Sequence, residues 1–324
     1  MPVSGSLKIR PGSEVDGPPR EFALDVCAGL SKTQKELHSK YLYDELGSAL
    51  FQAITHLPEY GVTRADARVL EAHAGDIARA ISQPVSVIEL GSGTGEKTWH
   101  ILREMAGARY FPIDVSADAL ARCEHDLAEV AEVYPLQQLY LDGMASAVAH
   151  RRSHETLLVL FLGSTIGNFE RPCALEFLRD LRRCLEHGDK LLLGVDLIKE
   201  RDRMLAAYDD PTGVTAAFNL NLLGRINREL GGHFELRNFE HQARWNDTER
   251  RIEMHLRSRR DQTVSVDAAD VSVSFRADET IWTESSHKFR LAEMFGLAAQ
   301  AGFAVEAQWV DREWPFAESL WTAL

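Results

Sequence analysis

Apolar residues in the first part of the chain follow two alternating patterns. The run "PVSVIEL" (residues 84–90) is short and rich in branched side chains, which predicts a buried strand, and "EKTWHILREM" (96–105) then spaces its apolar residues as a helix does. The same order returns in "RYFPIDV" (109–115) and "ADALARCEHDLAEV" (117–130). Alternation of strand and helix predicts a parallel sheet with helices on both faces.

The neighbouring segments extend this pattern. A helix is predicted over 63–81, where Thr63 and Asp66 stand at the spacing of a capping box. Three further buried strands and one helix are predicted from "LQQLYLD" (136–142), "TLLVLFLGS" (156–164), "KLLLGVDL" (190–197) and "ALEFLRDLRRCLEHG" (174–188). The fold class expected from them is α/β, with a Rossmann-like sheet.

The pattern changes after about residue 212. A helix over 214–230 is followed by alternation of period two in 233–245, 250–259 and 270–275, which predicts a β-meander. The end of the chain returns to a helix and two strands, which could complete the first sheet with an antiparallel edge. We therefore expect a second, smaller domain, and divide the chain into a flexible arm (1–20), a segment that packs with the smaller domain (21–62), the sheet domain (63–211 and 289–324) and the inserted domain (212–288).

The composition of the chain limits the kinds of molecule that it is expected to bind. The 324 residues are 45% hydrophobic and carry a net charge of −13, which argues against broad binding to nucleic acid or to anionic membranes, so a small-molecule substrate is expected. The four cysteines show no C-x-x-C spacing, and we interpret them as buried thiols in a reducing compartment. A soluble, cytoplasmic monomer without a metal is expected.

The stretch "VIELGSGTGEKT" (87–98) resembles a phosphate-binding loop but fails both known patterns. A nucleoside triphosphate loop needs glycine immediately before Lys97, and a dinucleotide fingerprint needs its third glycine one position after Gly95. Glu96 occupies the deciding position in both cases. Pyrophosphate is disfavoured beside an acid, whereas the sulfonium cation of S-adenosylmethionine tolerates one.

Polar residues close the predicted strands at the edge where ligands of such sheets bind. Asp114 ends the second strand and can accept both ribose hydroxyls, and Asp142 ends the third and fits an adenine amino group. Lys97 either meets the methionine carboxylate or is solvated. The alternatives are a glycine turn with no ligand and a dinucleotide site.

Several motifs together resemble the histidine Nα-methyltransferases of ergothioneine biosynthesis. They are "YLYDELGSALFQAITHLPEYGVTRAD", "ELGSGTGEKT", "FLGSTIGNF", "AYDDPTGVTAAFN", "RIEMHLR" and "TESSHKF", and they extend from about Asp25 to the C-terminus. The resemblance implies a class I methyltransferase sheet, S-adenosylmethionine as donor, S-adenosylhomocysteine as product, and three methylations of the α-amine of L-histidine to give hercynine.

The resemblance also implies roles for individual residues. Asn168 and Tyr208 would hold the substrate carboxylate, and Tyr43, Thr165 and the backbone of Gly163 would lie near the amine. The imidazole would contact Tyr60, Glu284 and Ser286, with Phe51 and Met254 as apolar walls, and the donor would contact Tyr43, Gly91, Lys97, Asp114 and Asp142. This chain differs from the family pattern at Gly95, where a serine is expected, and at Gly143, where an aromatic residue is expected.

Alternatives remain open at this point. Without the resemblance, "TES" (283–285) is more typical of a solvent-facing strand end, and Tyr208 is equally typical of a core residue. The enzyme could methylate another amino acid or amine, such as a tryptophan derivative or histamine. It could also be a protein that binds S-adenosylmethionine without catalysis.

Overall fold

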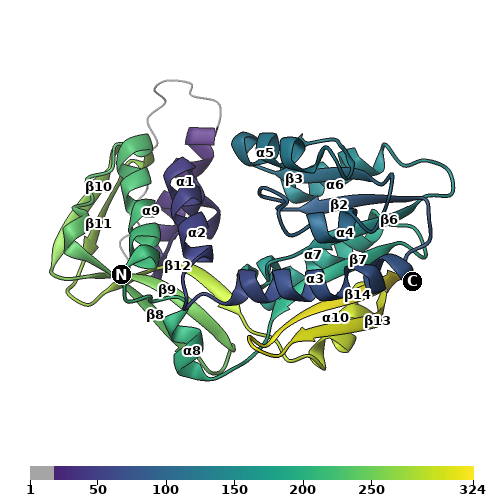
Figure 1. Ribbon diagram of the computed structural model, residues 1–324. Coiled ribbons are helices and arrows are strands. Elements are labelled where there is room, and N and C mark those ends of the chain that lie inside the picture. Colours follow the sequence, from purple (N-terminus) through teal and green to yellow (C-terminus); the bar gives the residue numbers. More distant parts are fainter. Residues whose placement is uncertain (1–17) are drawn as a thin grey trace, which may run out of the picture.

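Two lobes lie side by side in the computed structural model, which describes residues 18–324 (Figure 1). The large lobe contains the elements from α3 to β7 together with α10, β13 and β14. The small lobe contains α1, α2 and the elements from α8 to β12. The arm predicted for residues 1–20 lies outside the described residues up to residue 17, and residues 18–20 instead begin a helix.

An eight-stranded sheet forms the centre of the large lobe. Its order is β13-β14-β7-β6-β2-β3-β4, with β5 also paired to β3. The strands are β2 (Val85–Leu90), β3 (Arg109–Asp114), β4 (Glu132–Val133), β5 (Leu136–Gln137), β6 (Thr156–Phe161), β7 (Lys190–Asp196), β13 (Phe303–Asp311) and β14 (Phe316–Ala323). All pairs from β4 to β7 are parallel, whereas β14 runs antiparallel to both of its neighbours. The predicted sheet is confirmed, although its antiparallel strand lies one position inside the edge.

Helices cover both faces of this sheet, as predicted. One face packs against α3 (Val62–Arg79), α4 (Trp99–Leu102) and α5 (Ala117–Leu127), and the other against α6 (Tyr140–Val148), α7 (Arg171–Arg183) and α10 (Glu293–Ala301). A short 3-10 helix, η2 (Thr165–Asn168), follows β6. Each hydrophobic face of the sheet is therefore buried, which accounts for the continuous apolar strands.

Of the four cysteines only Cys123 is buried, and Cys173 is exposed on α7, so the expectation of buried thiols is wrong for Cys173.

The small lobe is built around a four-stranded sheet of order β1-β12-β9-β8. Its strands are β1 (Lys35–Glu36), β8 (Phe239–Asn246), β9 (Arg251–Ser258) and β12 (Thr280–His287), and β10 (Gln262–Val266) pairs with β11 (Val271–Phe275) as a separate hairpin. The helices are α1 (Pro18–Leu30), α2 (Glu45–Thr55), α8 (Arg201–Ala206) and α9 (Val214–Leu230), with 3-10 turns η1 (Ser39–Leu42), η3 (Leu236–Asn238) and η4 (Asp267–Ala269).

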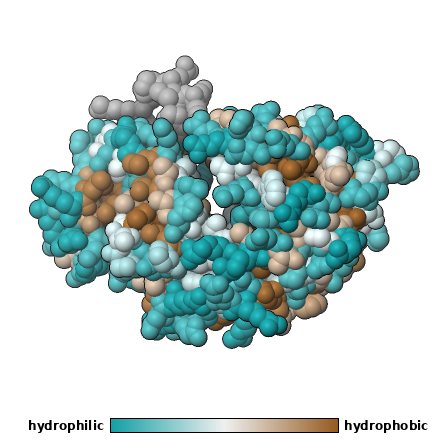
Figure 2. Space-filling model, viewed as in Figure 1, coloured by the Kyte–Doolittle hydropathy of each residue, from teal (hydrophilic) through white to brown (hydrophobic). Residues whose placement is uncertain are grey.

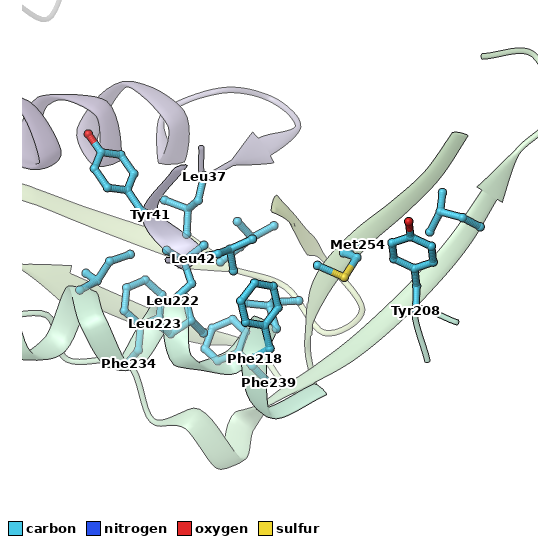
Figure 3. Close-up of a cluster of buried hydrophobic side chains, with 14 of the residues drawn as sticks. Leu37, Tyr41, Leu42, Tyr208, Phe218, Leu222, Leu223, Phe234, Phe239 and Met254 are labelled. Atoms are coloured by element: carbon cyan, nitrogen blue, oxygen red, sulfur yellow. The ribbon is translucent and has the colours of Figure 1, made fainter. Parts of the chain in front are cut away.

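One hydrophobic cluster joins the N-terminal segment to these strands. Leu37 and Leu42 pack with Phe218 and Leu222 of α9 and with Phe239 of β8 (Figure 3). The segment also supplies β1, which runs parallel to β12. The predicted β-meander is only partly correct. The strand at 270–275 pairs with β10, and β12, which contains "TES", completes the sheet instead.

Two local predictions are wrong. Helix α3 begins after Gly61, which has no side chain to cap it, and Asp66 accepts a hydrogen bond from Lys97 instead. Strand β5 ends at Gln137, and Asp142 lies exposed in the first turn of α6. The small residues of "DGMASAV" (142–148) suit a helix packed against β3, where Gly143 contacts Ile113.

Within residues 18–324, no helix combines the length and hydrophobicity needed to cross a membrane.

Candidate active site

The glycine turn after β2 takes the conformation that its sequence requires. Gly91, Gly93 and Gly95 have φ angles of 73°, 54° and 71°, a region that disfavours residues with a Cβ atom. A Cβ at Gly95 would lie 2.7 Å from the Cys123 Sγ, so glycine is needed there for space as well. The serine expected from the family pattern would therefore clash with α5 in this chain.

Asp114 fixes this turn from the end of β3. One carboxylate oxygen accepts the Gly93 N–H and the other accepts the Ser116 N–H, both at 2.9 Å. Each oxygen of a carboxylate can accept more than one hydrogen bond, so these contacts leave acceptor capacity for ribose hydroxyls. The structure is thus compatible with the predicted ribose role, and it adds a structural role that the sequence did not reveal.

Other residues lie where Asp142 was expected. Gln138 follows β5 directly, its backbone N–H donates to the Asp114 carbonyl at 3.2 Å, and its Oε1 is buried without a hydrogen-bond partner among the described residues. The Tyr140 ring packs edge-on against Phe161 at 5.7 Å, and its hydroxyl would lie 3.3 Å from a Cβ at Gly91. Gln138 and Tyr140 are therefore candidates for donor contacts, and the adenine contact of Asp142 stays a prediction.

Lys97 is partly exposed and is held by a protein carboxylate. Its Nζ forms an ion pair with Asp66, a fully buried residue of α3. Burial opposes the charged form of Lys97, but the attraction of Asp66 outweighs it and raises the lysine pKa. The same Asp66 oxygen accepts the Gly163 N–H at 2.9 Å. Asp66 therefore joins the glycine turn of β2 to the loop after β6, and a contact between Lys97 and the donor carboxylate stays a prediction.

A second buried acid lies beneath the turn. Glu89 is 2% exposed and accepts hydrogen bonds from Thr98, at 2.6 Å, and from the Tyr110 hydroxyl. Burial raises its pKa to about 7, although both hydrogen bonds act in the opposite direction. The donor side of the site is therefore rich in carboxyl groups, which favours a cationic ligand over an anionic one.

The loop after β6 offers an unused acceptor. Thr165 donates both its backbone N–H and its hydroxyl to the Leu162 carbonyl, and Gly167 N–H donates to the Ser164 carbonyl. Within residues 18–324 no donor is found for the Gly163 carbonyl between them, nor for the half-buried side chain of Asn168. These groups can therefore meet a ligand that carries an amine and a carboxylate.

Aromatic side chains of the small lobe form a continuous wall. Tyr43 lies edge-on to Phe51 at 5.5 Å, Phe51 to Tyr60 at 6.3 Å, and Tyr60 to Tyr208 at 6.0 Å. Burial raises the pKa of Tyr43, Tyr60 and Tyr208 well above the usual value, so all three hydroxyls stay protonated. Residues from α2, from the end of η1 and from the segments that follow α2 and α8 are brought together here, as the resemblance implied.

Met254 borders the same wall on β9. Figure 3 shows it between Tyr208 and the cluster around Phe218. In the β9–β12 pair Met254 stands opposite Glu284, so the two side chains are neighbours on one face of the sheet. An apolar wall thus lies directly beside an acid.

Glu284 on β12 has no ion-pair partner among the described residues. Its side chain is buried, and among the described residues its carboxylate accepts no hydrogen bond. Burial raises its pKa to about 7, with Lys288 acting in the opposite direction. Ser286 lies two residues further along β12 and therefore on the same face. A ligand with polar hydrogens would satisfy Glu284.

A buried polar network holds Ser286 in place. Its Oγ lies 2.7 Å from the Tyr208 hydroxyl, and Lys288 donates to both, at 2.9 and 2.8 Å. Lys288 is fully buried and pairs at 2.8 Å with Asp196, the last residue of β7, which also binds Lys199 at 2.5 Å. Sequence analysis missed Lys288 and Asp196. The position of Lys288 in "TESSHKF" was the only available signal for it.

The predicted residues therefore gather at the edge of the large sheet and on the facing small lobe, with Asp142 as the exception. The donor residues lie at the carboxyl ends of β2 and β3, and the acceptor residues on η2, β9, β12 and the aromatic wall. Figure 2 shows a narrow hollow between the two lobes. Asp66 was also missed, since its place near the start of α3 suggested a helix cap.

Comparison with known proteins identifies the family. The model of the S-adenosylmethionine-dependent, histidine-specific methyltransferases matches residues 22–323. The chain belongs to this family. It is 44% identical to a histidine N-alpha-methyltransferase of Mycolicibacterium smegmatis over 91% of this chain and 93% of that protein. It is 42% identical to one of Mycobacterium tuberculosis with the same coverage.

A fungal relative shares part of the chain. Ergothioneine biosynthesis protein 1 of Neurospora crassa is 34% identical over 61% of this chain, which corresponds to 23% of that protein. Membership in the histidine-specific methyltransferase family confirms the Rossmann-like fold class, the enzymatic activity and S-adenosylmethionine as cofactor. The choice of S-adenosylmethionine over a dinucleotide was therefore correct.

Proposed function

We propose that this enzyme transfers three methyl groups from S-adenosylmethionine to the α-amine of L-histidine. The product would be hercynine, with S-adenosylhomocysteine released at each step, as a stage of ergothioneine biosynthesis. Family membership supports the amino-acid substrate and the donor. Two similar proteins, both histidine N-alpha-methyltransferases, support histidine as that amino acid.

The observation that carries the choice of histidine is the unsatisfied acid beside Ser286. A neutral imidazole has one nitrogen that donates and one that accepts a hydrogen bond. Glu284 can accept from the first, and a hydroxyl such as that of Ser286 can donate to the second. A site built around such bonds rejects apolar side chains strongly, because its own polar groups would be left unpaired.

The chemical step is an in-line displacement. The neutral amine attacks the methyl carbon, a carbon–nitrogen bond forms, the carbon–sulfur bond breaks, and its electron pair returns to sulfur. One proton leaves the amine for each methyl group added. The sulfonium is already an activated electrophile, so the protein chiefly has to hold nitrogen and methyl carbon at about 3 to 3.5 Å and in line.

The side chains of this site suit that task. Asn168 and the Tyr208 hydroxyl would donate to the substrate carboxylate. Each hydroxyl has one proton, so the hydrogen bond between Tyr208 and Ser286 would break when the substrate binds, and both oxygens would still accept from Lys288. Tyr43, Thr165 and the free carbonyl of Gly163 would orient the amine. Tyr43 stays protonated because burial raises its pKa, so it can direct the lone pair but cannot serve as an anionic base.

Product mass tests the proposal. The protein is incubated with S-adenosylmethionine and, separately, with each common amino acid and with histamine, which lacks the carboxylate. We expect mass gains in steps of one methyl group on histidine alone. Glu284→Gln is the matched variant: it should lose selectivity for histidine while binding S-adenosylhomocysteine as well as the wild type does.

Other outcomes decide between the alternatives. Methylation of a different amino acid, of a tryptophan derivative or of histamine would replace histidine as the substrate. Tight binding of S-adenosylhomocysteine with no product from any amine would indicate a protein that binds the donor without catalysis. We further propose a cytoplasmic monomer that binds neither nucleic acid nor membranes, and light scattering at working concentration would reveal any larger assembly.

A further inference from the structure

Two acids meet beneath the Gly163 loop, and Lys97 forms an ion pair with one of them. Asp66 of α3 and Glu318 of β14 are both fully buried. One Asp66 oxygen binds Lys97 and the Gly163 N–H. The other Asp66 oxygen and both Glu318 oxygens have no donor among the described residues. Leaving three buried carboxyl oxygens unpaired is costly, so this cluster needs a further hydrogen-bond donor.

A glycine makes room for the second acid. Glu318 stands opposite Gly194 in the β14–β7 pair, and a Cβ at Gly194 would lie 2.6 Å from the Glu318 carboxyl and 3.3 Å from the Gly163 nitrogen. The carboxyl therefore occupies the space directly under the Gly163 loop, against Asp66. Burial first, and then the charge of Asp66, raise the pKa of Glu318 well above its usual value.

We infer that Glu318 is a neutral carboxylic acid whose hydroxyl donates to Asp66, and that this acid pair positions the Gly163 loop for methyl transfer. The shared proton supplies the missing donor and removes the repulsion between two buried carboxylates. Asp66, Lys97 and Glu318 then carry no net charge together. The charged groups that face Glu318 are Asp66 from α3, Lys97 from the glycine turn and Glu89 from β2.

The loop needs such support because its backbone is constrained. Gly163 and Ser164 have φ angles of 70° and 60°, and this region is unfavourable for serine. The Asp66 carboxylate holds the Gly163 N–H on one side, and the Ser164 hydroxyl accepts the Asp196 N–H at 2.9 Å on the other. Between these anchors lies the Gly163 carbonyl, the acceptor that the proposed function assigns to the amine. The acid pair touches no substrate and acts through this loop.

Two variants separate a shared proton from simple packing. Glu318→Gln keeps a donor toward Asp66 but cannot ionise, whereas Glu318→Leu fills similar space and removes the donor. We expect Glu318→Gln to keep kcat for histidine within about threefold and Glu318→Leu to lower it about tenfold or more, each with little change in S-adenosylmethionine KM. In the wild type, kcat should fall at alkaline pH as Glu318 ionises. This fall should be absent in Glu318→Gln. Equal kcat values in the two variants would overturn the inference.

A second measurement needs no turnover. With carbon-13 in the glutamate carboxyls, nuclear magnetic resonance at about pH 8 should show one protonated carboxyl that is missing in Glu318→Gln, since an ordinary glutamate is ionised there. Its absence in the wild type would overturn the inference even if histidine is methylated. Its presence in a protein that does not methylate histidine would contradict only the proposed function.

Discussion

Replacing Glu284 with glutamine should stabilise the protein in a pH-dependent manner. Burial raises the pKa of Glu284 from 4.5 to about 7 in the folded protein. Between these values the unfolded chain loses the proton and the folded chain keeps it, so the free energy of unfolding falls as pH rises. The interval spans about 2.5 pH units at about 1.4 kcal/mol each, which amounts to roughly 3 kcal/mol.

Glutamine has nearly the same shape and cannot ionise. The free energy of unfolding of Glu284→Gln should therefore match that of the wild type near pH 4.5 and exceed it by up to about 3 kcal/mol above pH 7. Urea unfolding at several pH values between 4.5 and 8 measures this difference. Tyr134→Phe, a change on the surface of the large lobe, is a suitable control because it should show no trend of this size.

The same substitution should impair recognition of histidine. A glutamine can replace the hydrogen bond but not the charge. A hydrogen bond to a charged group contributes about 1–1.5 kcal/mol more than a neutral one, so KM for histidine should rise about fivefold to tenfold. The reasoning would be refuted by a stability difference that does not vary with pH. It would also be refuted by an unchanged KM together with the expected stability change, because the buried acid would then not contact the substrate.

Three further predictions concern the donor side and the link between the lobes. Gln138→Leu should weaken binding of S-adenosylhomocysteine about tenfold and Asp142→Asn by less than about twofold in calorimetry, and the reverse ranking would restore Asp142 as the adenine contact. Gly95→Ser should lower the free energy of unfolding by about 1–3 kcal/mol, measured by thermal denaturation, because its Cβ would clash where φ is 71°. Lys288→Met should cost about 3–5 kcal/mol in urea unfolding, because Asp196 loses one of its two buried cations.

The layered sheet could be predicted because its strands and helices have clear periodicity. Buried parallel strands are continuously apolar, and the helices between them repeat apolar residues at helical spacing. Asp142 shows where prediction from periodicity fails. The sequence contains a strand of two residues followed by a helix rich in small residues, and its apolar positions resemble those of one longer strand. The prediction that 270–275 would join the meander was wrong for a related reason. An alternation of period two predicts a strand but does not predict its partner, which here is β10.

The site was predictable only where its chemistry follows a local motif. The glycine turn and the acid after β3 are visible in sequence because they are adjacent to strand ends. Asp66 and Glu318 are separated by 252 positions, as their numbers show, and neither belongs to a motif. Tertiary packing alone brings them under one loop. The spacing between Thr63 and Asp66 instead suggested that Asp66 takes part in a helix cap.

The junction of the lobes explains why the two halves of the site depend on each other. Strand β7 of the large lobe ends at Asp196, and the chain after β12 of the small lobe passes beside it, with the Phe289 N–H donating to the Asp196 carbonyl at 2.9 Å. At this crossing Lys288 joins Asp196 to Tyr208 and Ser286, and Ser164 binds the Asp196 N–H. The groups proposed to hold the substrate and the loop proposed to orient its amine are therefore fixed to the same residue. A change at Asp196 should displace the acceptor relative to the donor, and methyl transfer, which requires an aligned nitrogen, carbon and sulfur, should fall more than the binding of either ligand.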